Sequence, residues 1–317
     1  MKIAFLDSHT LSLNGDVDFS VLRSLGNYTG YALTNKDNII PYCKKADIVI
    51  VNKIIISENS IKKLPNLKLI AVIATGYNNI DIEAAKENNI KVTNVPDYAA
   101  NSVSQHVFSL ILNLTTKAYL YNEDVKKGEW SKSSNFGLLK YPTFELNGKI
   151  IGIIGFGAIG RAVASIASGF GMKVIVNDIK DISNTDCKKC SIEYILKNAD
   201  IVSIHCPLNS QTKNMIDAAA IKKMKRSAIL INTSRGGIVN EAELAQALTS
   251  GEIAGAGIDV LSEEPPQNSN PLLQNIKNLI ITPHTAWSTF EARQRMIDIT
   301  AENIRAFLNG KNYNLVF

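Results

Sequence analysis

Short apolar runs rich in isoleucine and valine alternate along the chain with longer amphipathic segments. Such runs are typical of strands buried on both faces of a parallel sheet. We expect strands at residues 2–7, 28–34, 46–52, 67–74, 91–94, 149–154, 173–177, 201–204, 228–231, 254–258 and 279–282. We expect helices at residues 18–25, 81–88, 101–120, 161–170, 192–197, 240–250 and 288–308. Because strands and helices alternate, the predicted fold class is α/β with parallel, doubly wound sheets.

A glycine motif follows the predicted strand at 149–154. Gly155, Gly157 and Gly160 have G-x-G-x-x-G spacing, and a predicted helix comes directly after them. In a dinucleotide-binding turn these glycines permit the tight turn, the approach of a pyrophosphate and close helix packing. The phosphates would meet the free N–H groups at the helix N-terminus. Glycine turns also serve simply to reverse a chain, so the strand and helix on either side are what favour a nucleotide site.

An acidic residue, Asp178, ends the next predicted strand. A carboxylate there can accept hydrogen bonds from an adenosine ribose and would repel a 2′-phosphate, which predicts NAD rather than NADP. The alternative is that Asp178 only caps the strand.

Length and composition narrow the function classes. A chain of 317 residues exceeds the usual size of one domain, so two are expected. The net charge of +5 is dispersed, and the basic cluster at 222–226 lacks interleaved aromatic residues, so no nucleic-acid partner is expected. No apolar segment approaches the ~20 residues that span a bilayer, so no membrane association is expected.

Cys187 and Cys190 have C-x-x-C spacing but no second ligand pair, so no metal is expected. An incidental loop is favoured over a redox pair.

We also expect a cytoplasmic protein. No signal-peptide pattern precedes the first strand, and the scattered cysteines do not form a disulfide framework.

Polar residues repeatedly follow the predicted strands of the second half, where such sheets present them to ligands. Arg235 offers a fork for a carboxylate or carbonyl, and His284 can exchange a proton near neutral pH. Glu264 could bind one ring nitrogen of His284, fix its tautomer and stabilise the charged ring. Together they suit the interconversion of an alcohol and a ketone beside a carboxylate. Separately, they could be a surface ion pair, a loop charge and a strand-end cap.

Another turn, Thr75-Gly76-Tyr77, follows a predicted strand of the first half. Its backbone N–H groups could hold an anion, but taken alone it is better explained as a plain turn.

The motifs taken together resemble the D-isomer-specific 2-hydroxyacid dehydrogenase family over nearly the whole chain. They are Gly155-Phe-Gly-Ala-Ile-Gly160, His205-Cys-Pro-Leu208, Asn232-Thr-Ser-Arg-Gly236, Asp259 through Glu264-Pro265, and Pro283-His284. The resemblance implies that His284 is the acid/base, Glu264 its support, and Arg235 the residue that binds the substrate carboxyl and carbonyl groups. One departure is that an arginine often follows the second fingerprint glycine, whereas this chain has Ala158.

The resemblance also implies further binding residues. NAD contacts are expected at Gly155, Phe156, Gly157, Ala158, Ile159, Gly160, Asp178, His205, Cys206, Pro207, Thr212, Thr233, Ser234, Asp259 and His284. Substrate contacts are expected at Lys53, Thr75, Gly76, Tyr77, Arg235 and His284.

The family resemblance implies a discontinuous architecture. A Rossmann NAD-binding domain at 101–287 would be inserted into a flavodoxin-like substrate domain at 1–100 and 288–317. The last helix would return to the first domain, and Ser288 with Glu291 has the form of its capping box. The helix at 101–120 resembles the family's dimer arm, so a homodimer is expected.

Finer motifs, such as Val51-Asn-Lys53, Gly128-Glu-Trp130 and Pro283-His-Thr-Ala-Trp287, resemble the glycerate dehydrogenase or hydroxypyruvate reductase branch. The predicted function is NAD-dependent reduction of a small 2-keto acid to the D-2-hydroxy acid, with hydroxypyruvate and D-glycerate favoured. Glyoxylate, pyruvate and phosphohydroxypyruvate are alternative substrates. From another class, a non-catalytic NADH-sensing corepressor is the alternative.

Overall fold

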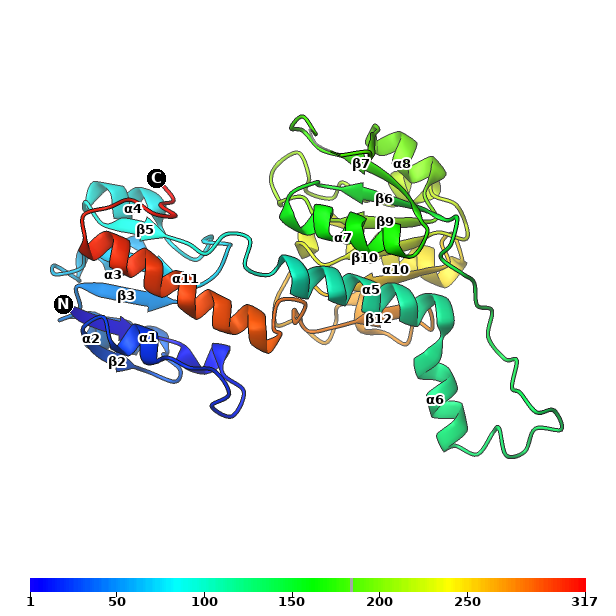
Figure 1. The fold of residues 1–317 in the computed structure, drawn as a ribbon, viewed down its shortest axis with the longest axis horizontal. Coiled ribbons are helices and arrows are strands. Elements are labelled where there is room, and N and C mark those ends of the chain that lie inside the picture. Colours follow the sequence, from blue (N-terminus) through cyan, green and yellow to red (C-terminus); the bar gives the residue numbers. More distant parts are fainter. Residues whose placement is uncertain (183–184) are drawn as a thin grey trace. The chain divides into compact units, whose positions relative to one another are not determined.

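The computed structural model describes residues 1–182 and 185–317, which form two compact units. The first unit comprises Met1–Ala99 and Trp287–Phe317, and the second comprises Ala100–Ala286. Figure 1 shows the elements of each unit. Within the described residues, no helix is long and apolar enough to cross a membrane.

The first unit is built on a five-stranded parallel sheet with the order β2-β1-β3-β4-β5. Its strands are β1 (Lys2–Phe5), β2 (Asn27–Gly30), β3 (Ile48–Val51), β4 (Leu69–Val72) and β5 (Lys91–Thr93). Its helices are α1 (Ser20–Arg23), α2 (Ile39–Cys43), α3 (Glu58–Lys62), α4 (Ile82–Glu87) and α11 (Phe290–Leu308), with short 3-10 helices at Ser8–Leu11 and Lys36–Asn38. The strand order is that of flavodoxin-like folds. Every residue of β3 and β4 is buried, as their unbroken apolar runs predict.

Helix α11 returns the end of the chain to this sheet, where it packs on α1 and β4 (Figure 1). Arg293, on α11, forms a bidentate ion pair with Asp16 at 2.8 and 2.6 Å and donates to the carbonyl of Leu11. The predicted capping box is wrong, because the N-cap is Thr289, whose hydroxyl accepts from the N–H of Ala292. The helix therefore starts at Phe290, one residue later than it would start if Ser288 were the N-cap.

The second unit contains a seven-stranded parallel sheet with the order β12-β11-β10-β9-β6-β7-β8. Its strands are β6 (Ile150–Ile154), β7 (Lys173–Asn177), β8 (Lys188–Lys189), β9 (Ile201–Ile204), β10 (Ile229–Asn232), β11 (Gly255–Ile258) and β12 (Leu279–Ile281). Its helices are α5 (Ala100–Thr116), α6 (Ala118–Lys126), α7 (Ala158–Gly169), α8 (Ile192–Asn198), α9 (Ala218–Lys222) and α10 (Glu241–Ser250), with 3-10 helices at Gly236–Ile238 and Pro271–Leu273. From β8 to β11 this is the Rossmann order, extended by β12. The predicted fold class is confirmed.

Two features of this sheet place the site. The strand order reverses between β6 and β9, which is the switch point where such sheets bind ligands. On one face, α5 packs against α7, β10 and β11 (Figure 1). Gly257 permits that packing, since a Cβ atom there would lie 3.0 Å from the Cβ atom of Leu110.

The helix predicted at 101–120 is instead two helices. Lys117 adopts a left-handed conformation, with a φ of 56°, and separates α5 from α6. The hydroxyl of Thr116 donates to the carbonyl of Leu112 at 2.6 Å, a local bond that competes with the helical backbone pattern. Helix α6 and the loop at 127–149 project from the body of the second unit (Figure 1). We call residues 117–147 the arm.

Candidate active site

The loops after β6 and β9 touch at the switch point because Gly155 has no side chain. Its φ is +96°, and a Cβ atom there would lie 2.5 Å from the backbone of both His205 and Cys206. A Cβ atom on Gly160 would run into the carbonyl of Gly155, so this glycine allows α7 to start against the turn. Around Gly157 the corresponding space is open. Thus the three glycines meet the requirements of the fingerprint: turn, close packing and an open approach.

Asp178, at the end of β7, stabilises the glycine turn that follows β6. Its carboxylate accepts from the N–H of Phe156 at 2.6 Å and from that of Lys180 at 2.8 Å. Burial alone would raise the pKa of Asp178. The two N–H donors and the charges of Lys180 and Lys189 outweigh burial and lower the pKa below its ordinary value of 3.8. The group is therefore a carboxylate at neutral pH, as recognition of a ribose requires.

A cavity of about 560 Å³ opens beside these loops. Most of the predicted NAD residues line it, namely Gly155, Phe156, Gly157, Ala158, Asp178, His205, Cys206, Pro207 and Thr212. Ile179 and Ile182 supply apolar wall, and the start of α7 supplies backbone donors. An apolar slot, a carboxylate and a helix N-terminus fit the adenosine, ribose and pyrophosphate parts of NAD.

Two ionisable groups at this cavity, His205 and Cys206, are held in their neutral forms. Burial lowers the pKa of His205 to about 3, and its Nε2 lies 2.8 Å from the hydroxyl of Ser203. Burial also raises the pKa of Cys206 to about 11. Imidazole and thiol are both neutral at physiological pH, so neither His205 nor Cys206 adds charge to the cavity. Thr212 donates to the carbonyl of Pro207 at 2.7 Å and so ties the loop that follows β9.

The predicted NAD residues Ile159, Gly160, Thr233, Ser234, Asp259 and His284 do not line this cavity. The hydroxyl of Ser234 donates to the carbonyl of Cys206 and so links the loops after β9 and β10. Among the described residues, the buried hydroxyl of Thr233 has no hydrogen-bond partner. A buried hydroxyl without a partner is costly, which fits a position that completes its bonding with a ligand.

Arg235 follows Thr233 and Ser234 in the loop after β10. Its side chain is exposed, and its Nη1 donates to the carbonyl of Ser234 at 2.8 Å. The next residue, Gly236, lies directly on the backbone of Leu261, where a Cβ atom would clash. The loop that carries Arg235 therefore packs on the segment that leads to Glu264.

His284 and Glu264 form the pair expected from the sequence. Nδ1 of His284 lies 2.6 Å from Oε2 of Glu264, and the other carboxylate oxygen accepts from the N–H of Leu261 at 2.9 Å. The two side chains retain 28% and 35% exposure, so the histidine remains accessible to a small molecule. Because Nδ1 contacts a carboxylate, exchange of a proton with a substrate would use Nε2.

Asp259, at the end of β11, holds the segment that carries His284. Its carboxylate accepts from the hydroxyl of Thr282 at 2.5 Å and from the N–H groups of Thr285 at 2.9 Å and Ala286 at 3.0 Å. Its carbonyl accepts from the N–H of His284, whose φ of 54° is left-handed. Sequence reasoning did not assign this anchoring role, although an aspartate directly after a strand was a signal for it. His106 completes the group, since its Nε2 lies 2.9 Å from the hydroxyl of Thr282.

The predicted substrate residues Lys53, Thr75, Gly76 and Tyr77 belong to the first unit and follow β3 and β4. Asn79 ties the two loops together by donating to the carbonyl of Ile54. Lys53 is exposed, and its Nζ lies 5.9 Å from the ring centroid of Trp287. The hydroxyl of Thr75 donates to the carbonyl of Val95 at 2.8 Å, and the carbonyl of Thr75 accepts from the side-chain amide of Asn94 at 2.8 Å, so the turn is tied to the segment that follows β5.

Asp7 fixes the loop that carries Lys53, a role that sequence reasoning missed. Its carboxylate accepts from the N–H groups of Asn52 at 2.9 Å and Lys53 at 2.6 Å. Burial raises the pKa of Asp7, although those N–H groups partly offset it. Its position directly after a buried strand was the available signal.

In the described ranges, no group of three or more His, Cys, Asp or Glu residues is placed to hold a metal ion. Cys187 and Cys190 are free thiols.

Comparison with known proteins identifies relatives over the full length. The sequence model of the D-isomer specific 2-hydroxyacid dehydrogenase NAD binding domain matches residues 108–286. A glycerate dehydrogenase from Methylorubrum extorquens is 41% identical, covering 99% of this chain and 98% of the relative. A hydroxypyruvate reductase from Blautia hydrogenotrophica is 39% identical, covering 100% and 99%. Among solved structures, an acyclic imino acid reductase in complex with NADPH and D-Arg matches with a TM-score of 0.87 at 32% identity, covering 100% of both chains.

Proposed function

Because the chain belongs to the D-isomer-specific 2-hydroxyacid dehydrogenase family and is an NAD-dependent oxidoreductase, we propose that it reduces hydroxypyruvate to D-glycerate. The observation that carries the proposal is the 2.6 Å contact between His284 and Glu264, next to the loop that carries Arg235. The names of the two relatives supply the choice of substrate within the family.

His284 is the proton donor in this proposal. Its Nε2 delivers a proton to the C2 oxygen of the 2-keto acid as that oxygen gains charge. Glu264 holds the Nδ1 side, keeps the ring in the required tautomer and stabilises the imidazolium before the transfer. NADH, when bound, supplies the hydride. In the reverse direction, Nε2 takes the proton from the hydroxyl group.

Arg235 binds the carboxylate and polarises the carbonyl of the substrate. Its guanidinium can form two parallel hydrogen bonds with a carboxylate. Donors placed where negative charge develops stabilise the transition state, and loss of one typically costs on the order of 10²–10³ in rate. Lys53, Thr75, Gly76 and Tyr77 would add contacts to the rest of the substrate.

Each unit receives one role in this proposal. Residues 101–287 form the NAD-binding domain, and residues 1–100 with 288–317 form the substrate domain. The cavity at the Rossmann switch point supports the first assignment, and the loops after β3 and β4 support the second. We also propose a cytoplasmic location, which the four free cysteines support.

A substrate panel with NADH tests the proposed function. A pocket discriminates one methylene by only ~1–3 kcal/mol, so kcat/KM must be compared across hydroxypyruvate, glyoxylate, pyruvate and phosphohydroxypyruvate. We expect hydroxypyruvate to give the highest value. A different preferred acid would contradict the substrate and leave the reaction class intact. Activity with none of them would favour the NADH-sensing corepressor.

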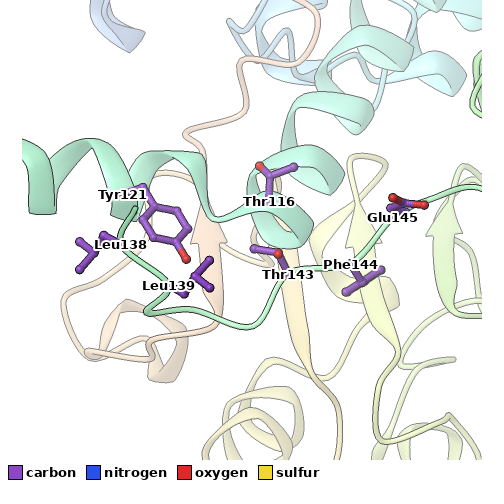
Figure 2. Close-up of a pocket in the computed structure, with 7 residues that line it drawn as sticks. All are labelled: Thr116, Tyr121, Leu138, Leu139, Thr143, Phe144 and Glu145. Atoms are coloured by element: carbon purple, nitrogen blue, oxygen red, sulfur yellow. The ribbon is translucent and has the colours of Figure 1, made fainter. Parts of the chain in front are cut away.

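The homodimer was expected from the helix at 101–120; since α5 packs on α7, β10 and β11 of its own unit, we propose that the arm, residues 117–147, forms the dimer contact. Phe136 and Leu139 are almost fully exposed, and Trp130, whose Nε1 donates to the carbonyl of Phe136, is half exposed. A cavity of about 700 Å³ lies at the base of the arm, where the Tyr121 ring lies beside Leu138 and Leu139 (Figure 2). Large apolar side chains on a projecting segment are typical of a surface that another chain covers. A second copy of this chain is the occupant we propose.

Asp124 gives the arm a fixed shape before any partner binds. Its carboxylate accepts from the ammonium of Lys140 at 2.9 Å and the hydroxyl of Tyr141 at 2.7 Å. Sedimentation of Leu139→Glu tests the dimer, with Leu33→Glu, at an exposed leucine outside the arm, as the control. We expect only Leu139→Glu to shift the protein to monomer. An unchanged mass for Leu139→Glu, or a monomeric wild type, would contradict the dimer.

A further inference from the structure

Arg161 lines the cofactor cavity beside the glycine fingerprint. Ala158, which directly follows the second fingerprint glycine, brings no charge to the cavity. We infer that Arg161 supplies the cation that binds the pyrophosphate of the dinucleotide. Both Ala158 and Arg161 line the cavity.

The helix geometry directs the Arg161 side chain toward the fingerprint. Arg161 lies in the first turn of α7, and its N–H donates to the carbonyl of Gly157 at 3.0 Å. Side chains on a helix tilt toward its N-terminus, so a residue covers the surface over the preceding turn. The surface over the turn before Arg161 includes Gly157, beside which the space is open.

Phe156 holds the guanidinium in place. The Cζ atom of Arg161 lies 4.7 Å from the centroid of the Phe156 ring, within the range of a cation–π contact. The ring itself is only 4% exposed, and the N–H of Phe156 is bonded to Asp178. The aromatic support is therefore fixed before the cofactor arrives, which reduces the entropy lost when the arginine binds an anion.

The charge of Arg161 is not neutralised by the protein. Among the described residues, no carboxylate forms an ion pair with Arg161 and no acceptor takes a hydrogen bond from its guanidinium. The nearby carboxylate of Asp178 is engaged by the N–H groups of Phe156 and Lys180. A pyrophosphate diester carries two negative charges and suits a guanidinium together with the N–H groups of the α7 N-terminus.

Binding of ADP-ribose and of adenosine separates a phosphate contact from a general effect on the cavity. Adenosine lacks the phosphates, so a residue that binds them changes only the affinity for ADP-ribose. We expect Arg161→Gln to weaken ADP-ribose binding about tenfold in calorimetry and to leave adenosine binding unchanged. Arg161→Lys, which keeps the charge, should lie between the wild type and Arg161→Gln. Arg226→Gln removes an equal charge from an exposed site away from the cavity and should leave both affinities unchanged.

A compensating variant makes the test independent of folding. Ala158→Arg, added to Arg161→Gln, should restore most of the ADP-ribose affinity by returning one cation to the lining of the cavity. The inference is overturned if Arg161→Gln binds ADP-ribose as tightly as the wild type. Equal losses for ADP-ribose and adenosine, or a double variant no tighter than Arg161→Gln, also overturn it. No substrate is used, so the result is independent of the proposed reaction.

Discussion

Oε2 of Glu264 lies 2.6 Å from Nδ1 of His284, and Oε1 of the same carboxylate is held by the N–H of Leu261. Both oxygens of Glu264 are thus engaged, so the carboxylate cannot rotate without losing a bond. The histidine proposed as the acid/base therefore has a fixed ring orientation before any substrate binds, and the proposed chemistry depends on this pair.

The pair predicts unequal effects of two substitutions. His284→Asn removes the proton donor and should lower kcat by roughly 10²–10⁴. Glu264→Gln keeps the size of the side chain but weakens support for the charged ring, so its loss should be smaller. Stopped-flow traces and NADH fluorescence titration should show slower hydride transfer with nearly unchanged NADH affinity. A His284→Asn enzyme with wild-type turnover would remove His284 from the mechanism.

A substitution of Asp259 can distinguish two roles, contact with NAD and anchoring of the segment that carries His284. The sequence predicts that it contacts NAD, whereas its carboxylate bonds to Thr282, Thr285 and Ala286 within its own unit. Asp259→Asn replaces one of the two acceptor oxygens by an amide N–H donor and should displace the segment that carries His284. If anchoring dominates, kcat falls by at least tenfold while NADH affinity stays within about threefold. If direct contact dominates, the dissociation constant of NADH rises instead.

The carboxylate of Asp178 predicts a preference for NADH over NADPH. A 2′-phosphate would be repelled by this charge, while Lys180 and Lys189 nearby would attract it once the charge is removed. Asp178→Ala should therefore lower kcat/KM with NADH and raise it with NADPH. The ratio of the two values in the wild type and the variant is the measurement. A wild type that uses both cofactors equally would contradict this assignment.

The ion pair between Asp16 and Arg293 predicts a pH-dependent stability. The Arg293 guanidinium lowers the pKa of Asp16 from 3.8 to about 2. Because the pKa is lower in the folded state, the pair stabilises the fold fully above pH 3.8, and this contribution is lost as the pH falls toward 2. Asp16→Asn should melt at a lower temperature than the wild type at pH 7, and the difference should shrink as the pH falls through this window. Asp37→Asn, at an exposed carboxylate without an ion pair among the described residues, is the control. A difference that stays constant with pH would contradict the account.

Unbroken apolar runs were the most reliable guide to the fold. Strands Lys173–Asn177 and Ile201–Ile204 have the predicted bounds; every residue of the second is buried, and burial on both faces leaves a continuous apolar signal. Strand β8, the pair Lys188–Lys189, was not predicted because it is short and polar. The break at Lys117 was missed because hydrophobic spacing does not report a single left-handed residue.

The candidate catalytic residues were predictable from the sequence because only a few residue types can perform each proposed task. Arg235, Glu264 and His284 each have few substitutes for their proposed tasks, and the structure brings Glu264 and His284 together. The supporting residues were not predictable in the same way. Asp7 and Asp259 act through bonds to backbone N–H groups of segments distant in sequence, and such bonds appear only when the chain has folded.

The most direct test of the central claim is the product of the reaction itself. The enzyme should convert hydroxypyruvate and NADH to glycerate, and chiral chromatography should find the D-isomer in the wild type. His284→Asn, assayed at the same enzyme concentration, should yield almost none. L-glycerate as the product, or full turnover without the His284 imidazole, would contradict the account.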